Sequence, residues 1–408
     1  MTARQPKLRD ATYWLMIAMV FTLPWEGEVE IPGVGQVSRF VGILVGVSWV
    51  ALVLQTRRMR EPHALHIFGL LFVIWNAFSS MWTVDGPVTE GATLTYAQLV
   101  VLTLVLWDMS RTLAEVRHSL LAYLAGCYVT IGSLLLGYAA EGQASEVHGR
   151  VTVSGFHPND VGMILALGVP VAGYVLDQPG TGPFRSLRLV AAALYLPVSG
   201  FAVLITGSRA GLGAMLPGVL YLGYLLARRR PAIAAGSVVG LIGITLLLLP
   251  LVPPRVVLRL EGTGAAVDGG DLNERTEIWG EAVRLIHEHP LTGIGGGAFK
   301  SAAVAVNKNG HNFVLALLAE VGIIGFGLFA ALLVTAVLAL RRQDRLLGGM
   351  WAAFFSAWLF AGLLHNWEDR KQTWFMLALM VASGALERGR EPDTGAALPE
   401  PTADIEVT

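Results

Sequence analysis

The sequence contains little charge and a single cysteine. Only 14% of its 408 residues are charged, whereas a soluble domain usually has about 25%. Cys127 has no partner for an intramolecular disulfide, and a cysteine-based zinc site is excluded. The formal net charge of −1 gives no basic excess that would indicate nucleic-acid binding. With 54% hydrophobic residues and a mean hydropathy of +0.59, the composition indicates a polytopic membrane protein rather than a soluble enzyme, a disordered regulator or a secreted disulfide scaffold.

Long apolar runs recur along the chain. A helix that crosses a bilayer needs about 20 mostly apolar residues, and a β-barrel would instead show alternating segments of about ten. We therefore predict an all-α polytopic membrane protein with twelve spans. The runs before and after Arg209 are joined by almost nothing, so they must form a tight hairpin. The predicted spans are 12–24, 39–55, 64–81, 93–109, 118–140, 159–176, 187–205, 209–227, 232–250, 311–339, 347–365 and 373–388.

The first apolar run lacks a small-residue cleavage site after it, so we interpret it as the first span rather than as a cleavable signal. With the N-terminus inside, 18 of the 29 Lys and Arg residues fall in cytoplasmic stretches, and the charge bias alternates correctly at every loop. Both termini are then cytoplasmic. Residues 1–388 form one integral membrane domain, and 389–408 form a disordered cytoplasmic tail.

One large loop, 251–310, lies outside. Asn273 can cap a helix that runs to His289, where Pro290 stops it. Arg275 falls on the apolar side of this helix, either snorkelling or aimed into a cavity. A glycine run at 293–297 predicts a turn, because Ala298 breaks the dinucleotide-binding pattern. The apolar face of this helix comprises Ile278, Trp279, Ala282, Val283 and Ile286. Its predicted solvent-facing (wet) face comprises Glu277, Glu281, Arg284 and Glu288.

Polar residues gather at the outer ends of the spans, where charged groups are costly and often functional. Each also has a structural interpretation: a snorkelling arginine, a helix cap, a packed polar residue or a solvated turn. Glu26 and Glu28 in the first outer loop are the best candidate metal ligands, although acidic clusters are weak here. The candidate site residues at this side are Arg150, Asn159, Arg209, His311, Asn312, Glu320, Asp369 and Arg370.

This combination suits a phosphorylated lipid substrate. Arginine binds phosphate oxygens bidentately and stays charged when partly dehydrated. A leaving pyrophosphate needs its developing charge neutralised by a metal or by fixed cations. A neutral histidine nearby could take the proton from an attacking hydroxyl.

A set of motifs resembles the O-antigen ligase/polymerase superfamily over roughly residues 150–330. Two spacings support the resemblance: ten residues separate Arg284 from Gly295, and ten separate His311 from Gly322. The motifs are Pro158-Asn159, Ser208-Arg209-x-Gly211, Arg275-x-x-x-Trp279 with Ala282, His289-Pro290-Leu291-x-Gly293-Ile294-Gly295-x-Gly297-x-Phe299, His311-Asn312-x-x-Leu315 and Glu320-x-Gly322-Ile323-x-Gly325.

The resemblance implies a metal-independent, inverting glycosyltransferase with a GT-C-like helical fold and no cofactor, in the bacterial inner membrane. Its donor would be a glycan on undecaprenyl pyrophosphate, and its periplasmic acceptor lipid A–core for a ligase or a second lipid-linked glycan for a polymerase. Arg209 and Arg275 would bind pyrophosphate, His311 would act as base or position the acceptor, and Arg284 would be a further contact. The His311-Asn312 pair favours the ligase.

Two other classes remain open from the sequence. A transporter such as a lipid-linked sugar flippase fits twelve spans, but it would show internal repeats and ionisable residues at the midplane. We find no repeat between the two halves, and the informative residues lie at one face. A receptor or assembly scaffold could also carry the outer loop, and it would bind no lipid-linked ligand.

Overall fold

The computed structural model describes residues 4–140, 145–147, 150–178, 184–229, 231–232, 249–252, 254–261, 275–304 and 310–388, together with residues 240, 243, 247, 306 and 308. Three predictions fall outside these residues: most of the ninth span at 232–250, the cap at Asn273, and the tail at 389–408.

Helices dominate the described chain, and one occupies every predicted span other than the ninth. By length and composition, seven of the described helices could cross a membrane. The all-helical, multi-pass class is therefore confirmed, whereas the number twelve stays a prediction. The helices are α1 (Arg4–Thr22), α2 (Val37–Thr56), α3 (Ala64–Ser79), α4 (Gly86–Met109), α5 (Leu113–Ala139), α6 (Pro158–Asp177), α7 (Arg185–Thr206), α8 (Arg209–Arg229), α10 (Pro254–Glu261), α12 (Arg275–Glu288), α13 (Phe299–Ala302), α14 (Phe313–Leu340), α15 (Arg345–Gly362) and α16 (Lys371–Arg388), with short 3₁₀ turns at Leu23–Trp25 and Leu249–Leu251.

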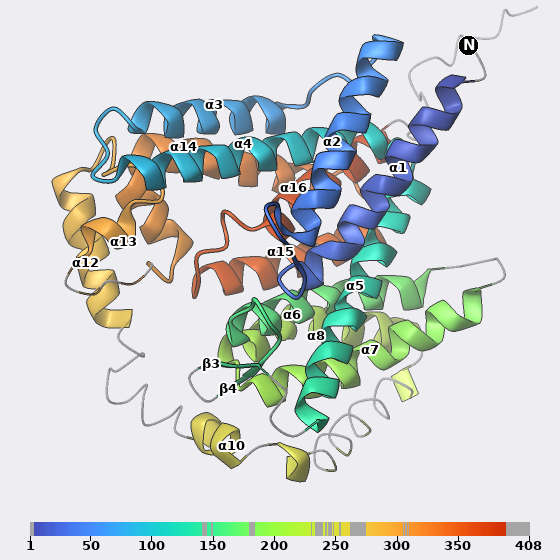
Figure 1. Ribbon diagram of the computed structural model, residues 1–408. Helices are drawn as coiled ribbons and strands as arrows, with labels where there is room; N and C mark the ends of the chain where they lie inside the picture. Colours follow the sequence, from blue (N-terminus) through green and yellow to red (C-terminus); the bar gives the residue numbers. More distant parts are fainter. Residues whose placement is uncertain are drawn as a thin grey trace, which may run out of the picture.

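Two short antiparallel hairpins accompany the helices. Strand β1 (Glu30–Ile31) pairs with β2 (Gly35–Gln36), and β3 (Ser145–Val147) pairs with β4 (Arg150–Thr152). Both lie in loops that the sequence places outside. The β3–β4 hairpin lies beside α6 (Figure 1), and β4 contacts α5, α6 and α7. It thereby brings Arg150 to the first turn of α6.

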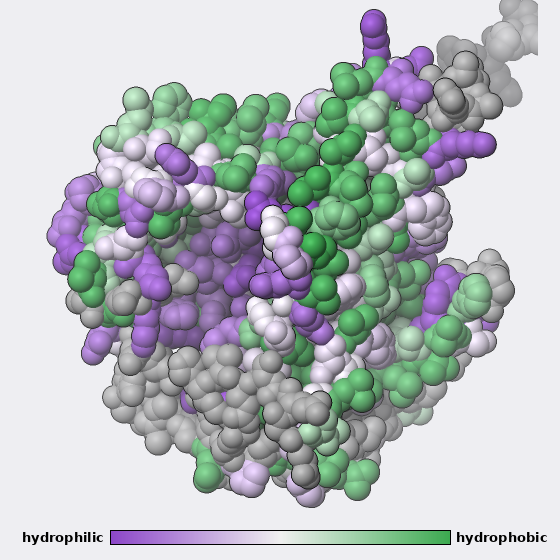
Figure 2. Space-filling model, viewed as in Figure 1, coloured by the Kyte–Doolittle hydropathy of each residue, from purple (hydrophilic) through white to green (hydrophobic). Residues whose placement is uncertain are grey.

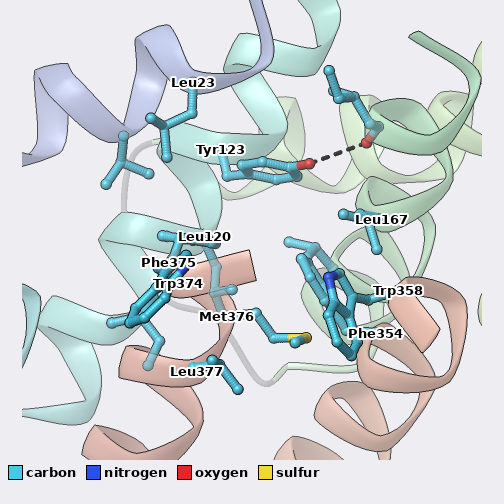
Figure 3. Packing of buried hydrophobic residues seen from close by; sticks show 14 of the residues in the cluster. Leu23, Leu120, Tyr123, Leu167, Phe354, Trp358, Trp374, Phe375, Met376 and Leu377 are labelled. Atoms are coloured by element: carbon cyan, nitrogen blue, oxygen red, sulfur yellow. Dashed lines mark hydrogen bonds between the residues drawn. The ribbon is translucent and has the colours of Figure 1, made fainter. Parts of the chain in front are cut away.

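Helix α6 is the most buried of the candidate spans and packs against α5, α7, α8 and α15. Figure 3 shows the aromatic core beside it, in which the Tyr123 hydroxyl donates to the Ile164 carbonyl at 3.1 Å and the Tyr123 ring stacks on Phe375. Helix α2, in contrast, exposes Val47 and Leu54, at 65% and 72%, as a helix facing lipid would. The difference in burial between α6 and α2 indicates that α6 lies at the centre of the bundle.

The glycine run at 293–297 packs against a break in helix α14, so it is more than the plain turn that the sequence predicts. Gly322 has φ 66° and ψ −172°, which interrupts the helix. The interruption leaves backbone groups of α14 available, and the Ile294 and Gly295 amides donate to Ala319 and Glu320 carbonyls at 3.0 and 2.9 Å. A Cβ on Gly322 would lie 2.2 Å from the Leu291 carbonyl oxygen, so only glycine permits this close approach.

The loop helix α12 ends next to Pro290 as predicted, but its buried face differs from the predicted apolar face. Ile278, Ala282 and Leu285 are buried against α14, whereas Val283 is 45% exposed. The expectation for Val283 was wrong because α14 covers the line i, i+4, i+7, and Val283 lies about 100° around the helix from Ala282. The predicted wet face is correct for Arg284, which is exposed.

Candidate active site

A hydrophilic hollow opens on one side of the molecule (Figure 2). In Figure 1 the same place is bordered by α12 and α13, and the turn between α15 and α16 crosses it. These elements, with the first turns of α6 and α8, carry most of the predicted polar residues. We therefore describe this end of the bundle as the candidate active site.

Asn159 joins three distant parts of the chain at this site. His157 caps α6, with Nδ1 accepting from the Asn159 amide at 3.2 Å. The Asn159 Oδ1 accepts from Arg150 Nη2 at 2.8 Å and from Ser208 Oγ at 3.1 Å. Its Nδ2 lies 2.7 Å from His365 Nε2. Because Oδ1 has two donors, the amide orientation is settled, and Asn159 must donate to His365.

The corner between α7 and α8 presents Arg209. Arg150 is buried and donates from Nε to the Thr206 carbonyl at 3.0 Å, and Gly207 then turns the chain with φ 60°. This is the predicted tight hairpin. Arg209 opens α8 half-buried, and its Nε has no hydrogen-bond partner among the described residues. An unsatisfied, shielded guanidinium nitrogen is costly, which favours a role in holding an anion.

Arg275 and His311 lie close together. The first residue of α12, Arg275, donates from Nη2 to the Leu364 carbonyl at 3.1 Å. His311 packs edge-on against His365, with ring centroids 5.2 Å apart. His311 also has φ 49°, a left-handed conformation that is uncommon for a residue with a side chain and is often found at functional sites.

Both histidines are held neutral. Burial, and next the charge of Arg275, lower the pKa of His311 to about 4. Burial, followed by His311 and Arg275, also lowers the pKa of His365 well below its usual value. The donated hydrogen bond from Asn159 is consistent with this, because it requires a lone pair on His365 Nε2 and so leaves the ring proton on Nδ1.

The turn before α16 is only partly solvated, because His365 and Glu368 are buried whereas the Asp369 side chain is 51% exposed. Trp367 is buried and donates from Nε1 to Asp160 Oδ1 at 3.1 Å. Arg370 Nη2 lies 3.4 Å from Asp160 Oδ2, and its Nε lies 3.9 Å from Asp369 Oδ1. The structure thus brings the predicted Asp369 and Arg370 to the first turn of α6.

Three further predicted residues have structural contacts of their own. Asn312 caps α14, accepting from the Val314 and Leu315 amides at 2.9 and 3.2 Å. Glu320 accepts from the Gly297 and Phe299 amides at 3.0 and 3.3 Å and so holds the glycine run. Arg284 pairs with Glu281 and Glu288 on the exposed face of α12, and these contacts do not join it to the histidines.

The two candidate metal ligands, Glu26 and Glu28, lie in different surroundings. The buried Glu26 carboxylate accepts from Lys371 Nζ at 2.5 Å and from the Ser38 hydroxyl. Glu28 is partly buried, which raises the pKa of its carboxyl. Within the described residues there is no group of three or more His, Cys, Asp or Glu side chains that could hold a metal ion.

Sequence reasoning missed two histidines of the site and one carboxylate. His157, His365 and Asp160 lie on the predicted outer side, but they are not among the candidate site residues predicted from the sequence. The available signal was their position at the same outer boundary as Asn159 and Asp369.

Residues 193–330 match the family model for O-antigen ligase. This confirms the resemblance to the O-antigen ligase/polymerase superfamily. No curated protein matches the chain. The matched segment contains Arg209, Arg275 and His311, whereas Asn159 and His365 lie outside it.

Proposed function

We propose that the protein is an O-antigen ligase-type glycosyltransferase that moves a glycan from undecaprenyl pyrophosphate to lipid A–core. The family match over residues 193–330 supports an activity of the O-antigen ligase/polymerase type in general. The observation that carries the finer proposal is the meeting of Arg275 with a neutral His311 and His365, linked through Asn159 and Ser208 to the start of α8. Arg209 is the next residue.

The two arginines would hold the donor pyrophosphate. Guanidinium groups keep their charge in a partly dehydrated site and match phosphate oxygens bidentately. As the bond between the sugar anomeric carbon and the pyrophosphate oxygen breaks, negative charge grows on that oxygen, and fixed cations stabilise it. We propose that Arg209 and Arg275 do this without a metal ion.

His311 would act as the base. With its pKa lowered to about 4, the imidazole is neutral at pH 7 and offers a lone pair to the acceptor hydroxyl. It would take the proton of the acceptor hydroxyl while the acceptor oxygen bonds to the anomeric carbon on the face opposite the leaving pyrophosphate, which inverts the configuration. His365, fixed by Asn159 and packed edge-on against His311, would hold that ring in place.

We place this site on the periplasmic side of the bacterial inner membrane, with both termini in the cytoplasm. The support is the Lys and Arg distribution, which is concentrated in the loops at the other end of the helices. A transporter would place polar groups along a central pathway, whereas the described polar cluster lies at one end of α6 and α8.

The test is an in vitro reaction of the purified chain with a lipid-linked oligosaccharide, with and without lipid A–core. We expect transfer of glycan to lipid A–core, at a rate at least about 100-fold lower with His311→Gln. Longer lipid-linked chains without core would instead identify a polymerase, in which a second lipid-linked glycan is the acceptor. No covalent product in either reaction would contradict a transferase.

A further inference from the structure

A second cationic site lies far from the candidate active site. A cavity of about 240 Å³ opens between α5, α6 and α7. Three arginines and one histidine line it, with Tyr174 and Gln178, and no described Asp or Glu is among the lining residues. The basic lining residues are Arg117, His118, Arg185 and Arg188.

The cavity and the active site lie at opposite ends of the same helix. Asn159 lies in the first turn of α6, whereas Gln178 is its C-terminal cap. At about 1.5 Å per residue, the 20-residue helix separates the two sites by about 30 Å. The cavity therefore takes no direct part in the proposed transfer.

Two of the cavity arginines, Arg117 and Arg185, have unused hydrogen-bonding capacity among the described residues. Arg117 donates from Nε to the Tyr174 hydroxyl at 3.2 Å, which orients the guanidinium. Its Nη groups, and the whole guanidinium of Arg185, make no hydrogen bond or ion pair in the part of the chain that the structure describes. Like charges that share a cavity repel one another unless an anion lies between them, and guanidinium groups match phosphate.

An apolar stripe on α7 begins beside the cavity. Leu187, Val190 and Leu194 are exposed, at 65%, 55% and 51%, and their i, i+3, i+7 spacing puts them on one face of the helix. On the other side of the cavity, His118 stacks on Trp14, which is 59% exposed. Amphipathic rings of this kind lie at the level of lipid headgroups. Cations at the end of a lipid-facing stripe fit a charged headgroup with its acyl chain.

We propose that this cavity binds the phosphate of an anionic phospholipid headgroup, with an acyl chain along Leu187, Val190 and Leu194. Arg117 and Arg185 hold the phosphate oxygens, and Arg188 adds charge at the cavity wall. The same chemistry could accept free phosphate, so the test compares a lipid with the inorganic ion.

The purified full chain in neutral detergent is titrated with short-chain phosphatidylglycerol, short-chain phosphatidylcholine and inorganic phosphate, and binding is read by native mass spectrometry. We expect phosphatidylglycerol to bind at least about tenfold more tightly than phosphatidylcholine or phosphate. The double variant Arg117→Gln/Arg185→Gln should lose at least about tenfold in that affinity, because hydrogen bonds to charged groups are strong. The control Arg342→Gln, an exposed arginine after α14, should bind like the wild type.

A second variant keeps the test decisive if the double variant does not fold. Ala114→Leu leaves every charge in place and adds bulk to the cavity wall, so it should also weaken phosphatidylglycerol binding. Wild-type affinity in both variants would overturn the proposal. Inorganic phosphate that binds as tightly as phosphatidylglycerol would show that the cavity takes a soluble anion and would overturn the lipid assignment.

Discussion

The side-chain nitrogen Nδ2 of Asn159 lies 2.7 Å from Nε2 of His365, a residue 206 positions away in the chain. This contact joins the start of α6 to the turn before α16, and His365 in turn packs against His311. The base proposed for the reaction is thus positioned by residues outside the matched O-antigen ligase segment. From this arrangement we draw five predictions.

The first concerns the two arginines proposed to bind pyrophosphate. Arg209→Lys and Arg275→Lys keep the charge but lose the planar, bidentate fork. We expect each to lower transfer by at least about tenfold, since a contact to a charged group is worth roughly 1.5–3 kcal/mol. Arg342→Lys, on an exposed turn, serves as the control and should transfer normally. Wild-type transfer by both variants would mean that neither guanidinium holds phosphate in this way.

The second concerns pH. The pKa of His311 is lowered to about 4 in the folded protein, and that of His365 is also lowered, whereas histidine in an unfolded chain titrates at about 6.5. At these two residues the unfolded state therefore binds more protons between these values, so their contribution to stability should decrease as the pH falls from about 6.5 towards 4. The melting temperature of the wild type relative to that of His365→Asn should therefore fall across this range. An equal decrease in both proteins would contradict the assignment.

The third concerns the break in α14. Gly322→Ala would place a Cβ against the Leu291 carbonyl in a backbone conformation essentially restricted to glycine. We expect a loss of about 1–3 kcal/mol in the free energy of unfolding and weaker docking of residues 290–295. Gly327→Ala, in the same helix with open space around its Cβ, is the matched control and should melt like the wild type. Equal melting temperatures for both variants would show that the break tolerates a side chain.

Much of this architecture is readable from the sequence. Apolar run lengths located the helices, and the heptad spacing of Arg275 and Ala282 put Arg275 on the inner side of α12. The contact of His365 with Asn159 was not readable, because it depends on how α6, α15 and α16 pack, and no local pattern records contacts over 206 residues. Leu285 is buried and Val283 is exposed because of where α14 lies, which the sequence of α12 does not show.

The break at Gly322 also escaped prediction. A glycine in an apolar helix usually costs only a little stability, so its sequence context does not distinguish a break from a simple helical position. The decisive partners, Leu291 and Ile294, belong to the loop that fills the break.

The fourth prediction concerns metal. If arginines stabilise the leaving pyrophosphate, transfer should survive excess EDTA. The buried ion pair of Glu26 with Lys371 agrees with this, because a metal ligand would have to give up that partner. Loss of transfer in EDTA with rescue by Mg²⁺ or Mn²⁺ would instead favour Glu26 and Glu28 as ligands.

The fifth concerns His311 as the base that takes the proton of the acceptor hydroxyl. General-base catalysis contributes about 10²–10⁴-fold, so His311→Gln, which can hydrogen-bond but cannot take the proton, should lower turnover by that order. The measurement is turnover and donor binding in the same purified variant, with lipid-linked donor and lipid A–core. We expect wild-type donor affinity with turnover reduced at least about 100-fold. Wild-type turnover would show that His311 only positions or caps, and that the base lies elsewhere.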